Sequence, residues 1–181
     1  PPAPWINVIA TKTFGFTISE TGAGYTWAYN SRENKLTPWS NDPVLDSCSE
    51  TIYVRDEVSQ RIMTPVSLGR KDKGVYRVKH SFGWSEFRHE EDDLAQRLTV
   101  FTPIGEPLKL WSLELTNHSN HERYFSLVYY AEWVLGVSRD LTGPYIVTSY
   151  NNEQEYMYAR NMYNYRYRKH RAFIFSSQMI T

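Results

Sequence analysis

The chain has 181 residues, which is the length of one domain and is long enough to bury a hydrophobic core. Its 20 lysines and arginines balance 20 aspartates and glutamates, so no bulk electrostatic attraction to nucleic acid or to an anionic membrane is expected. The single cysteine, Cys48, excludes an internal disulfide and a cysteine-based zinc site. No apolar run approaches the roughly 20 residues of a membrane helix, and the N-terminus has no signal-peptide pattern. Because the sequence starts at Pro1 without methionine and stops just after a strand-like run, we expect a piece of a longer protein.

Short strands separated by turn signals follow one another through the first half of the chain. Residues 14–18 alternate apolar with small or polar side chains, which predicts a half-buried strand. Residues 25–29 are expected to pair back with it across a glycine-containing turn. The following strands are predicted at residues 52–55, 75–78 and 81–89.

The same rhythm continues to the end of the chain. Gly83 interrupts a strand-like run and is interpreted as a bulge or a close backbone approach. Residues 94–101 alternate between two faces, and the runs 111–115 and 125–133 are predicted to form an antiparallel pair. The remaining strands are predicted at residues 145–150, 154–159, 163–168 and 172–177.

No window carries a long helical repeat of apolar residues, so the chain is predicted to be all-β. Strands with a turn signal roughly every ten residues are typical of a sandwich or a barrel of antiparallel sheets.

A polar and aromatic segment, residues 24–43, stands apart from the predicted strands. Trp27 and Trp39 flank a cluster of asparagine, serine, arginine and glutamate. Indole rings stack on apolar C–H surfaces, while amide, guanidinium and carboxylate groups hydrogen-bond to hydroxyls, and a sugar presents both kinds of surface. The segment is therefore a candidate carbohydrate site. Alternatively, the two tryptophans anchor the core or a hinge and the polar run is a solvated loop.

Other motifs are interpreted as structural. The acidic run 90–93 is expected to be a solvated turn, because neighbouring carboxylates on a strand point to opposite faces and cannot act together. The histidines lack metal-ligand spacing and are expected to be exposed or packing residues. No metal site, phosphate loop, nucleophile elbow or dinucleotide fingerprint is predicted.

Residues 163–171 give the main competing signal. Tyrosines alternate with asparagine and arginine, so a strand here would be aromatic on one face and basic on the other. Such surfaces bind single-stranded nucleic acid. The zero net charge favours a sandwich strand instead, with tyrosines on the core and the basic side in water, so no nucleic-acid partner is predicted.

Several segments together resemble the N-terminal β-domain of glycoside hydrolase family 94, with the strongest likeness to the phosphorylase-like region of cyclic β-1,2-glucan synthases. The likeness runs in order over nearly the whole chain. The matching segments are 2–10, 14–16, 24–27 (Gly-Tyr-Thr-Trp), 30–34 (Asn-Ser-Arg-Glu-Asn), 36–43 (Leu-Thr-Pro-Trp-Ser-Asn-Asp-Pro) and 129–136 (Tyr-Tyr-Ala-Glu-Trp-Val-Leu-Gly).

The resemblance implies a large antiparallel super-sandwich, similar to the galactose mutarotase fold. Residues 1–181 would be a single β-sandwich domain within a longer chain. In the family, a helical linker and an (α/α)6 barrel follow this domain. We expect neither of them here, and we expect the last strands of the sandwich to lie outside this chain as well.

The resemblance also implies an inverting phosphorolysis. A general-acid aspartate protonates the glycosidic oxygen, and inorganic phosphate attacks the anomeric carbon from the opposite face. In the family these groups come from the helical barrel, so no catalytic residue is assigned to this chain and the chain alone is expected to be inactive. No cofactor is expected; inorganic phosphate would be the co-substrate of the full enzyme.

Residue chemistry and resemblance together suggest a set of sugar-contacting residues. The tryptophans would stack on pyranose faces and the polar residues would bond to hydroxyls, with Glu33 holding Arg32 in place. The candidates are Trp27, Arg32, Glu33, Asn34, Trp39, Asn41 and Asp42.

We therefore expect the β-domain of an inverting β-glucan phosphorylase or cyclic β-1,2-glucan synthase, which shapes the acceptor side of the active site. The alternatives are a freestanding carbohydrate-binding module and a purely structural or dimerising domain. Expected partners are a β-glucan oligosaccharide, the protein's own (α/α)6 barrel, whose acidic surface could meet the basic residues of 163–171, and a second subunit of a homodimer. The expected location is the cytoplasm, without direct membrane contact by this segment but with a tether to the inner membrane through other regions in the synthase case.

Overall fold

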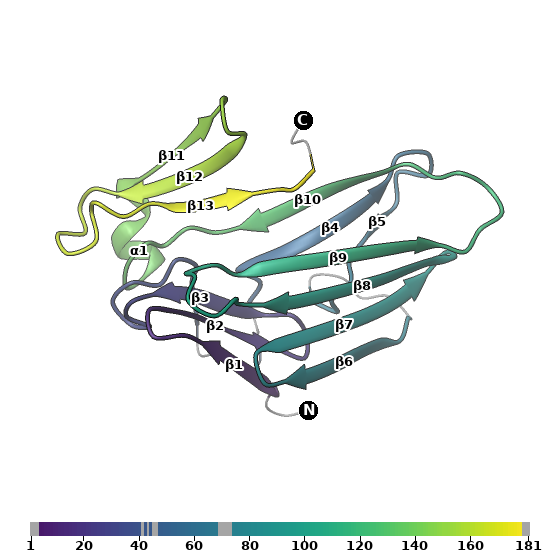
Figure 1. Cartoon of the computed structure of the whole chain (residues 1–181), viewed down its shortest axis with the longest axis horizontal. Helices are drawn as coiled ribbons and strands as arrows, with labels where there is room; N and C mark the ends of the chain where they lie inside the picture. The colour runs from purple at the N-terminus through teal and green to yellow at the C-terminus, as the bar shows by residue number, and fades with distance from the viewer. Residues whose placement is uncertain (1–3, 41, 43, 45–46, 69–73, 179–181) are drawn as a thin grey trace.

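The computed structural model describes residues 4–40, 42, 44, 47–68 and 74–178 of the chain. Within these residues, antiparallel strands form four sheets, and the helical content is one turn of α-helix and one turn of 3-10 helix. Figure 1 shows the sheets stacked in layers, with the N-terminus below and the C-terminal strands above. The all-β prediction is confirmed. No helix in this part of the chain is long and apolar enough to cross a membrane.

The first sheet has the order β1-β2-β3. Its strands are β1 (Ile6–Ala10), β2 (Phe14–Ser19) and β3 (Gly24–Ala28). The predicted hairpin is confirmed as the β2–β3 pair, in which Gly15 lies opposite Trp27 and Ile18 opposite Gly24. Phe16 and Ile18 are fully buried, because their face of the sheet forms one wall of the core.

The second sheet has the order β6-β7-β8-β9 and faces the first. Its strands are β6 (Tyr76–Ser81), β7 (Trp84–Glu91), β8 (Leu94–Phe101) and β9 (Leu110–Asn117). The alternation predicted for residues 94–101 is confirmed, since every second residue of β8 from Leu94 is buried. The solvated turn predicted for the acidic run 90–93 is confirmed only for Asp92 and Asp93, which form the β7–β8 turn with positive φ. For Glu90 and Glu91 the prediction was wrong, because they are the last residues of β7.

The bulge prediction for Gly83 was wrong. Phe82 and Gly83 form the two-residue turn between β6 and β7, and Gly83 has a φ of 81°. A tight hairpin turn favours glycine where the backbone must adopt positive φ, so the residue closes a hairpin rather than interrupting a strand.

The third sheet has the order β10-β4-β5. Its strands are β4 (Glu50–Asp56), β5 (Ile62–Met63) and β10 (Phe125–Ala131). The predicted pairing of 111–115 with 125–133 was wrong: β9 pairs with β8, whereas β10 pairs with β4. The connection between β9 and β10 swings around one end of the molecule and carries the chain from one layer to the other (Figure 1).

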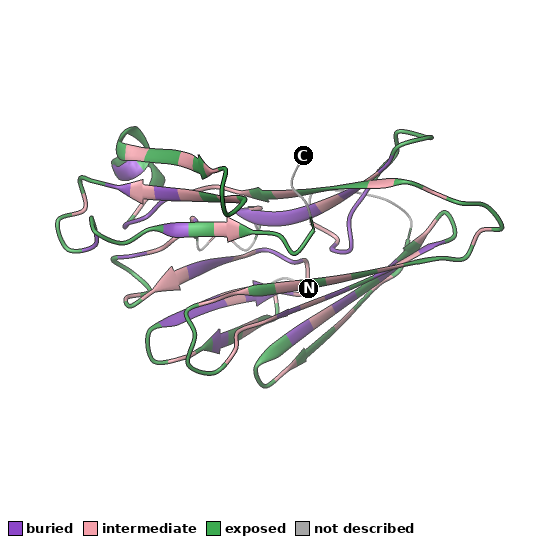
Figure 2. Cartoon of the chain, turned by 45° about the horizontal axis from the view of Figure 1, so that its top comes forward, coloured by how far each residue is buried: buried purple, intermediate pink, exposed green. Residues whose placement is uncertain are grey.

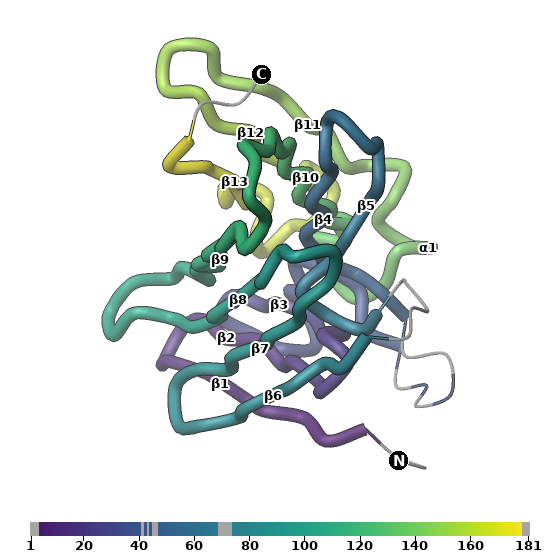
Figure 3. The backbone as a smooth tube through the Cα atoms, turned by 90° about the vertical axis from the view of Figure 1, so that its right-hand side faces the viewer, coloured from purple at the N-terminus to yellow at the C-terminus, as the bar shows by residue number. Residues whose placement is uncertain are grey.

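The fourth sheet has the order β11-β12-β13. It follows the short helix α1 (Arg139–Thr142) and the 3-10 turn η1 (Gly143–Tyr145). Its strands are β11 (Ile146–Asn151), β12 (Tyr156–Asn161) and β13 (Ala172–Phe175). This sheet extends away from the β6–β9 sheet (Figure 3).

The strand predicted at residues 163–168 was wrong, because this segment is a loop of turns between β12 and β13. Hydrogen bonds from the Tyr167 N–H to Asn164 and from the His170 N–H to the Tyr167 carbonyl close these turns. The alternation of tyrosine and arginine there does not reflect the two faces of a strand.

The main core lies between the first two sheets and reaches β4. It contains Phe16 and Ile18 from β2, Ile52 from β4, Phe87 from β7 and Leu98 from β8. Figure 2 shows buried residues along β2, β4, β7 and β8, whereas the residues of the β11–β13 sheet are mostly intermediate or exposed.

Candidate functional site

The segment proposed as a carbohydrate site leaves β3 after Ala28 and is fixed on both sides. We call residues 29–42 the polar loop. Lys35 forms isolated β-bridges with Trp27 and with Gly136, in the segment that follows β10. The Leu36 N–H donates to the Thr26 carbonyl at 2.8 Å. Backbone hydrogen bonds therefore hold the middle of the loop between β3 and the segment that follows β10.

A turn at the tip of the polar loop is built by two asparagines. The Asn30 Oδ1 accepts the backbone N–H groups of Arg32 and Glu33 at 2.9 and 2.8 Å. Asn34 donates its Nδ2–H to the Ala28 carbonyl at 2.9 Å, and Asn34 as a whole is only 4% exposed. Asparagine favours such turns because its short amide reproduces backbone hydrogen bonds. The structure thus places Asn34 in the base of the loop.

The aromatic residues of the segment form one cluster. Tyr25 stacks on Trp39 with ring centroids 5.2 Å apart and an interplanar angle of 18°. Tyr25 also contacts Trp27, with ring centroids 5.2 Å apart and the rings tilted by 37°. The Trp27 indole covers Gly15, where a Cβ atom would collide with the ring. Trp27 is half-buried, whereas Trp39 is 48% exposed. Trp39 is therefore a supported ring that still presents surface to solvent.

The charged candidates lie at the surface of the loop. Arg32 is exposed, and its Nε is 3.5 Å from the Glu33 Oε1, so Glu33 does pair with Arg32. Asp42 is half-buried, and its Oδ1 accepts the Val44 N–H at 3.0 Å. Asn41 lies outside the described residues.

A buried carboxylate lies beneath the loop. The Glu50 Oε1 accepts hydrogen bonds from the Thr26 hydroxyl at 2.6 Å and the Thr37 hydroxyl at 2.5 Å. The Glu50 Oε2 accepts from Lys109 Nζ at 2.7 Å and from the Tyr129 hydroxyl at 3.3 Å. These five residues come from β3, the polar loop, β4, the segment before β9, and β10. The network therefore joins the loop to two sheets and to the segment that leads into β9.

The electrostatics of this network favour a charged glutamate. Burial by itself would raise the pKa of Glu50, but the ammonium of Lys109 and the hydroxyls of Thr26 and Thr37 outweigh it and leave the pKa below its usual value. Burial, together with the Glu50 charge, raises the pKa of Tyr129 well above 10. Glu50 is thus an ionised anchor with a neutral tyrosine beside it, and not a proton donor.

Sequence reasoning missed this network, although a signal was present. Glu50 and Asp56 share the face of β4 that carries Ile52 and Val54, and all four residues are buried. A carboxylate in phase with the buried positions of a strand needs a buried partner. Lys109 supplies one from a distant segment that the sequence pattern could not identify.

The polar loop also contacts the loop between β12 and β13. Tyr29 has a φ of 63° and stacks 6.2 Å from Tyr167 and 5.0 Å from His170. The guanidinium of Arg168 lies 5.3 Å over the Tyr165 ring in the same loop. The polar loop and the segment of residues 163–171 therefore lie side by side in the structure.

The site contains groups for binding rather than for bond cleavage. Burial raises the pKa of the Cys48 thiol, so the thiol is neutral. In the described part of the chain, no three His, Cys, Asp or Glu side chains are grouped to hold a metal ion. What the loop offers is a supported tryptophan and an exposed guanidinium, a pair that can stack on and hydrogen-bond to a polyhydroxylated ligand.

Comparison with known proteins agrees with this all-β architecture. The chain is 36% identical over 176 residues to the cyclic beta-(1,2)-glucan synthase NdvB of Rhizobium meliloti (strain 1021), which covers 97% of this chain and 6% of that protein. It is 29% identical over 136 residues to the N,N'-diacetylchitobiose phosphorylase of Vibrio furnissii, covering 73% of this chain and 17% of the relative. A 3-O-beta-D-glucopyranosyl-beta-D-glucuronide phosphorylase of Paenibacillus borealis is 27% identical over 127 residues, or 70% of this chain and 15% of the relative.

The chain thus spans a small part of the length of these relatives. The family described as "Glycosyl hydrolase 94, supersandwich domain" matches residues 1–181, the whole sequence. Together with the layered antiparallel sheets, this match shows that the chain belongs to the glycosyl hydrolase 94 supersandwich family.

Proposed function

We propose that this domain shapes the acceptor side of the active site in a β-glucan phosphorylase or cyclic β-1,2-glucan synthase. It would contact the sugar through the polar loop and would perform no catalysis itself. The catalytic acid and the groups that hold inorganic phosphate would come from a helical barrel elsewhere in the full-length protein.

One observation carries the proposal: hydrogen bonds and a ring contact fix residues 30–39 of the polar loop, while Trp39 and Arg32 remain accessible. Trp39 rests on Tyr25 with about half of its surface exposed. The Thr37 hydroxyl is locked to the buried Glu50 only two residues away. A preorganised ring of this kind loses little conformational entropy when a ligand binds.

The exposure of the candidate residues supports different roles for them. Trp39 and Arg32 are exposed enough to contact a ligand, and Glu33 would keep the guanidinium oriented through their ion pair. Trp27 and Asn34 would support the loop without contacting the ligand. Trp27 covers Gly15, and Asn34 hydrogen-bonds to the Ala28 carbonyl.

The loop between β12 and β13, which contains residues 163–171, suggests how the domain would contact its partners. Arg166, Arg168 and Arg171 each lie over a tyrosine ring, and among the described residues none of them has a recorded carboxylate partner. An acidic surface of the barrel, or of a second subunit in a homodimer, would complement these cations.

A structural or dimerising domain is the second candidate function. The observation that favours it is the largely exposed β11–β13 sheet, where Phe173 and Phe175 face solvent. Exposed apolar surface of this kind marks contacts with other protein. A freestanding carbohydrate-binding module is the third alternative.

The test is acceptor kinetics of the full-length protein with short β-linked glucose acceptors. Trp39→Ala removes the stacking ring and Arg32→Ala removes the exposed charged donor. Arg32→Ala is expected to raise the acceptor KM by roughly tenfold or more, since a hydrogen bond to a charged group is worth about 1.5–3 kcal/mol. Trp39→Ala is expected to raise the acceptor KM in the same direction, because the sugar ring loses its aromatic contact.

Arg61→Ala is the matched control. It removes an arginine that pairs with Glu91 and Asp92 at the opposite end of β4, and it should leave the acceptor KM at the wild-type value. If Trp39→Ala and Arg32→Ala behave like this control, the polar loop is structural and the second candidate function takes precedence.

A further inference from the structure

The face of the β6–β9 sheet that points away from the core forms a second accessible surface, remote in sequence from the polar loop. Inward residues such as Phe87 and Leu98 pack in the core, so the alternate residues of the same strands point outward. We call this surface the outer face. Because the strands are in register, its side chains form rows that run across the sheet.

The row nearest the β6–β7 turn is aromatic. Trp84 on β7 lies opposite Phe101 on β8, and Phe101 lies opposite Leu110 on β9. A hollow of about 490 Å³ opens over this row, and Phe82 and Ile104, which are both fully exposed, border it from the adjoining turn and loop. Apolar side chains this exposed at the edge of a hollow mark a binding surface.

The next row, about 7 Å further along the strands, is polar. It contains Lys79, Glu86, Thr99 and Ser112 in register across four strands. The Glu86 Oε1 accepts a hydrogen bond from Arg88 Nε at 2.8 Å, so its carboxylate is held in place beside the aromatic row. Glu86 and Thr99 also line the hollow described above.

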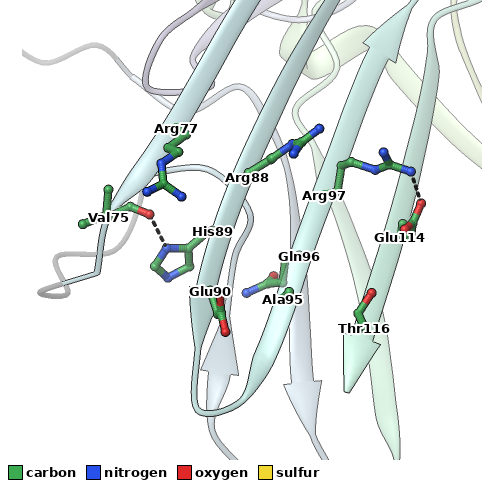
Figure 4. A pocket seen from close by; sticks show the side chains of 10 residues that line it. All are labelled: Val75, Arg77, Arg88, His89, Glu90, Ala95, Gln96, Arg97, Glu114 and Thr116. Atoms are coloured by element: carbon green, nitrogen blue, oxygen red, sulfur yellow. Dashed lines mark hydrogen bonds and ion pairs between the residues drawn. The ribbon is translucent and has the colours of Figure 1, made fainter. Parts of the chain in front are cut away.

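The third row is guanidinium-rich. Arg77, Arg88 and Arg97 lie on three neighbouring strands and line a second hollow of about 600 Å³, with Glu114 at the end of the row (Figure 4). Like charges placed directly opposite each other on a sheet are destabilising. Arg97 is relieved by its ion pair with Glu114 and Arg88 by Glu86. The planar guanidinium groups of this row can donate hydrogen bonds to a ligand that binds on the outer face.

We propose that the outer face is a second carbohydrate-binding surface, which takes a neutral β-glucan chain along the strands. The aromatic row would stack on sugar rings, and the polar and guanidinium rows would bond to hydroxyls. The inference rests on the proposed function in one respect only, that the full-length protein handles β-glucan. It adds a site that holds long chains apart from the acceptor site.

The middle row is the part of the face that favours a glycan over a protein partner, since the aromatic and arginine rows would suit either. The centre of a protein interface is depleted of lysine and glutamate. Here Lys79 and Glu86 stand in the middle row, between the aromatic and guanidinium rows. Two hollows on one open face also suit an extended chain better than a single compact ligand.

The experiment is affinity electrophoresis of the full-length protein in gels that contain a long linear β-1,2-glucan, with α-linked dextran as the comparison polymer. Trp84→Ala is expected to weaken retardation by the glucan about tenfold in apparent Kd, which corresponds to about 1.4 kcal/mol. Phe82→Ser is expected to weaken it in the same direction. This second variant protects the test, because the fully exposed Phe82 side chain contributes little to folding.

Val58→Ser, which alters an equally apolar turn residue after β4, is the matched control and should bind like the wild type. Unchanged retardation in both Trp84→Ala and Phe82→Ser, or no retardation of the wild type, overturns the inference. So does a wild-type dimer that Phe82→Ser dissociates in sedimentation equilibrium, because the face would then join two copies. The acceptor kinetics of Trp39→Ala are unaffected by these results, so the two proposals fail separately.

Discussion

Two carboxylates occupy opposite ends of one face of β4, and each has a cation from a distant segment beside it. Glu50 pairs with Lys109 at 2.7 Å, and Asp56 pairs with Arg123 at 2.8 Å. Buried ion pairs contribute little net stability, but removal of one partner leaves an uncompensated buried charge. At the residue scale, these pairs fix which segments can meet β4, and the Glu50 pair also holds the polar loop through Thr37.

Loss of the Glu50 charge is expected to loosen several elements together. In Glu50→Gln, the Lys109 ammonium would keep a buried position without its counter-ion, which costs about 3–5 kcal/mol. Hydrogen exchange of the full-length protein should show faster opening of the amides of β3, β4 and the polar loop.

A double variant separates charge imbalance from lost packing. In Glu50→Leu with Lys109→Met, both charges are gone and the apolar volume is kept, so much of the protection should return. Equal exchange rates in the single and double variants would show that the hydroxyl bonds to Thr26 and Thr37, and not the unpaired ammonium, dominate the effect.

Asp56 predicts a pH dependence at the other end of β4. The Ser59 N–H and then Arg123 lower the pKa of Asp56 from 3.8 to about 2. Because the folded-state pKa is the lower one, the stability that Asp56 contributes is complete above the unfolded-state pKa and is lost as the pH falls toward 2. The difference in opening free energy of the β4 amides between the wild type and Asp56→Asn should therefore shrink from pH 5 toward pH 2. A difference that stays constant over this range would mean that Asp56 acts through neutral hydrogen bonds alone.

At the scale of elements, periodicity identified strands and faces better than it identified partners. The β2–β3 hairpin could be predicted because the two strands are joined by a short turn. The partner of β9 could not, because an alternating apolar face packs equally well beside any neighbour, and β8 and β10 both offer one. The tyrosines and arginines of residues 163–168 alternate like a strand, yet stacking on Tyr29 and Tyr145 and the turn hydrogen bonds favour a loop.

The surroundings of the candidate site residues were predictable only in part. Residue chemistry singled out Trp39 and Arg32, and the structure exposes both, whereas their contact with sugar stays a prediction. The sequence could not separate them from Asn34, whose amide is used by the backbone of Ala28, nor find Lys109 beneath the loop. Burial and long-range pairing decide these roles, and neither is encoded locally.

Gly24 tests how closely the β2–β3 hairpin controls the site. A Cβ atom at this position would collide with the Thr17 carbonyl of the paired strand. Gly24→Ala should therefore force the strands apart and cost about 1–3 kcal/mol, the usual range for overpacking. The effect should appear as faster proteolysis at the polar loop in the full-length protein.

Gly143→Ala is the comparison variant, since a Cβ there meets no atom within 4 Å other than those of its two chain neighbours. It should destabilise the protein less than Gly24→Ala, because its only added strain is that of an alanine with helical dihedrals before Pro144. If Gly24→Ala is as well tolerated as Gly143→Ala, the hairpin backbone can shift without disturbing the loop.

At the scale of the whole molecule, the four sheets differ in how completely they are covered. The β1–β3 and β6–β9 sheets enclose the main core together with β4. The β11–β13 sheet instead buries only a small cluster around Leu135, Ala159 and Ala172. On its other face, Val147, Phe173 and Phe175 are exposed.

We expect this exposed face to be covered in the full-length protein. Val147, Tyr158 and Phe173 share the face through strand register, and Tyr156 packs edge-on against Phe173 at 6.3 Å, so the surface is an ordered apolar layer. Phe175→Asp would place an unpaired charge inside such a contact and should destabilise the full-length protein by about 1–3 kcal/mol. Thermal unfolding measures this loss against Val58→Asp, a change at an 80% exposed turn residue that should be tolerated. Equal tolerance of both changes would mean that the β11–β13 sheet remains open to solvent, which would remove the observation that favours the structural or dimerising function.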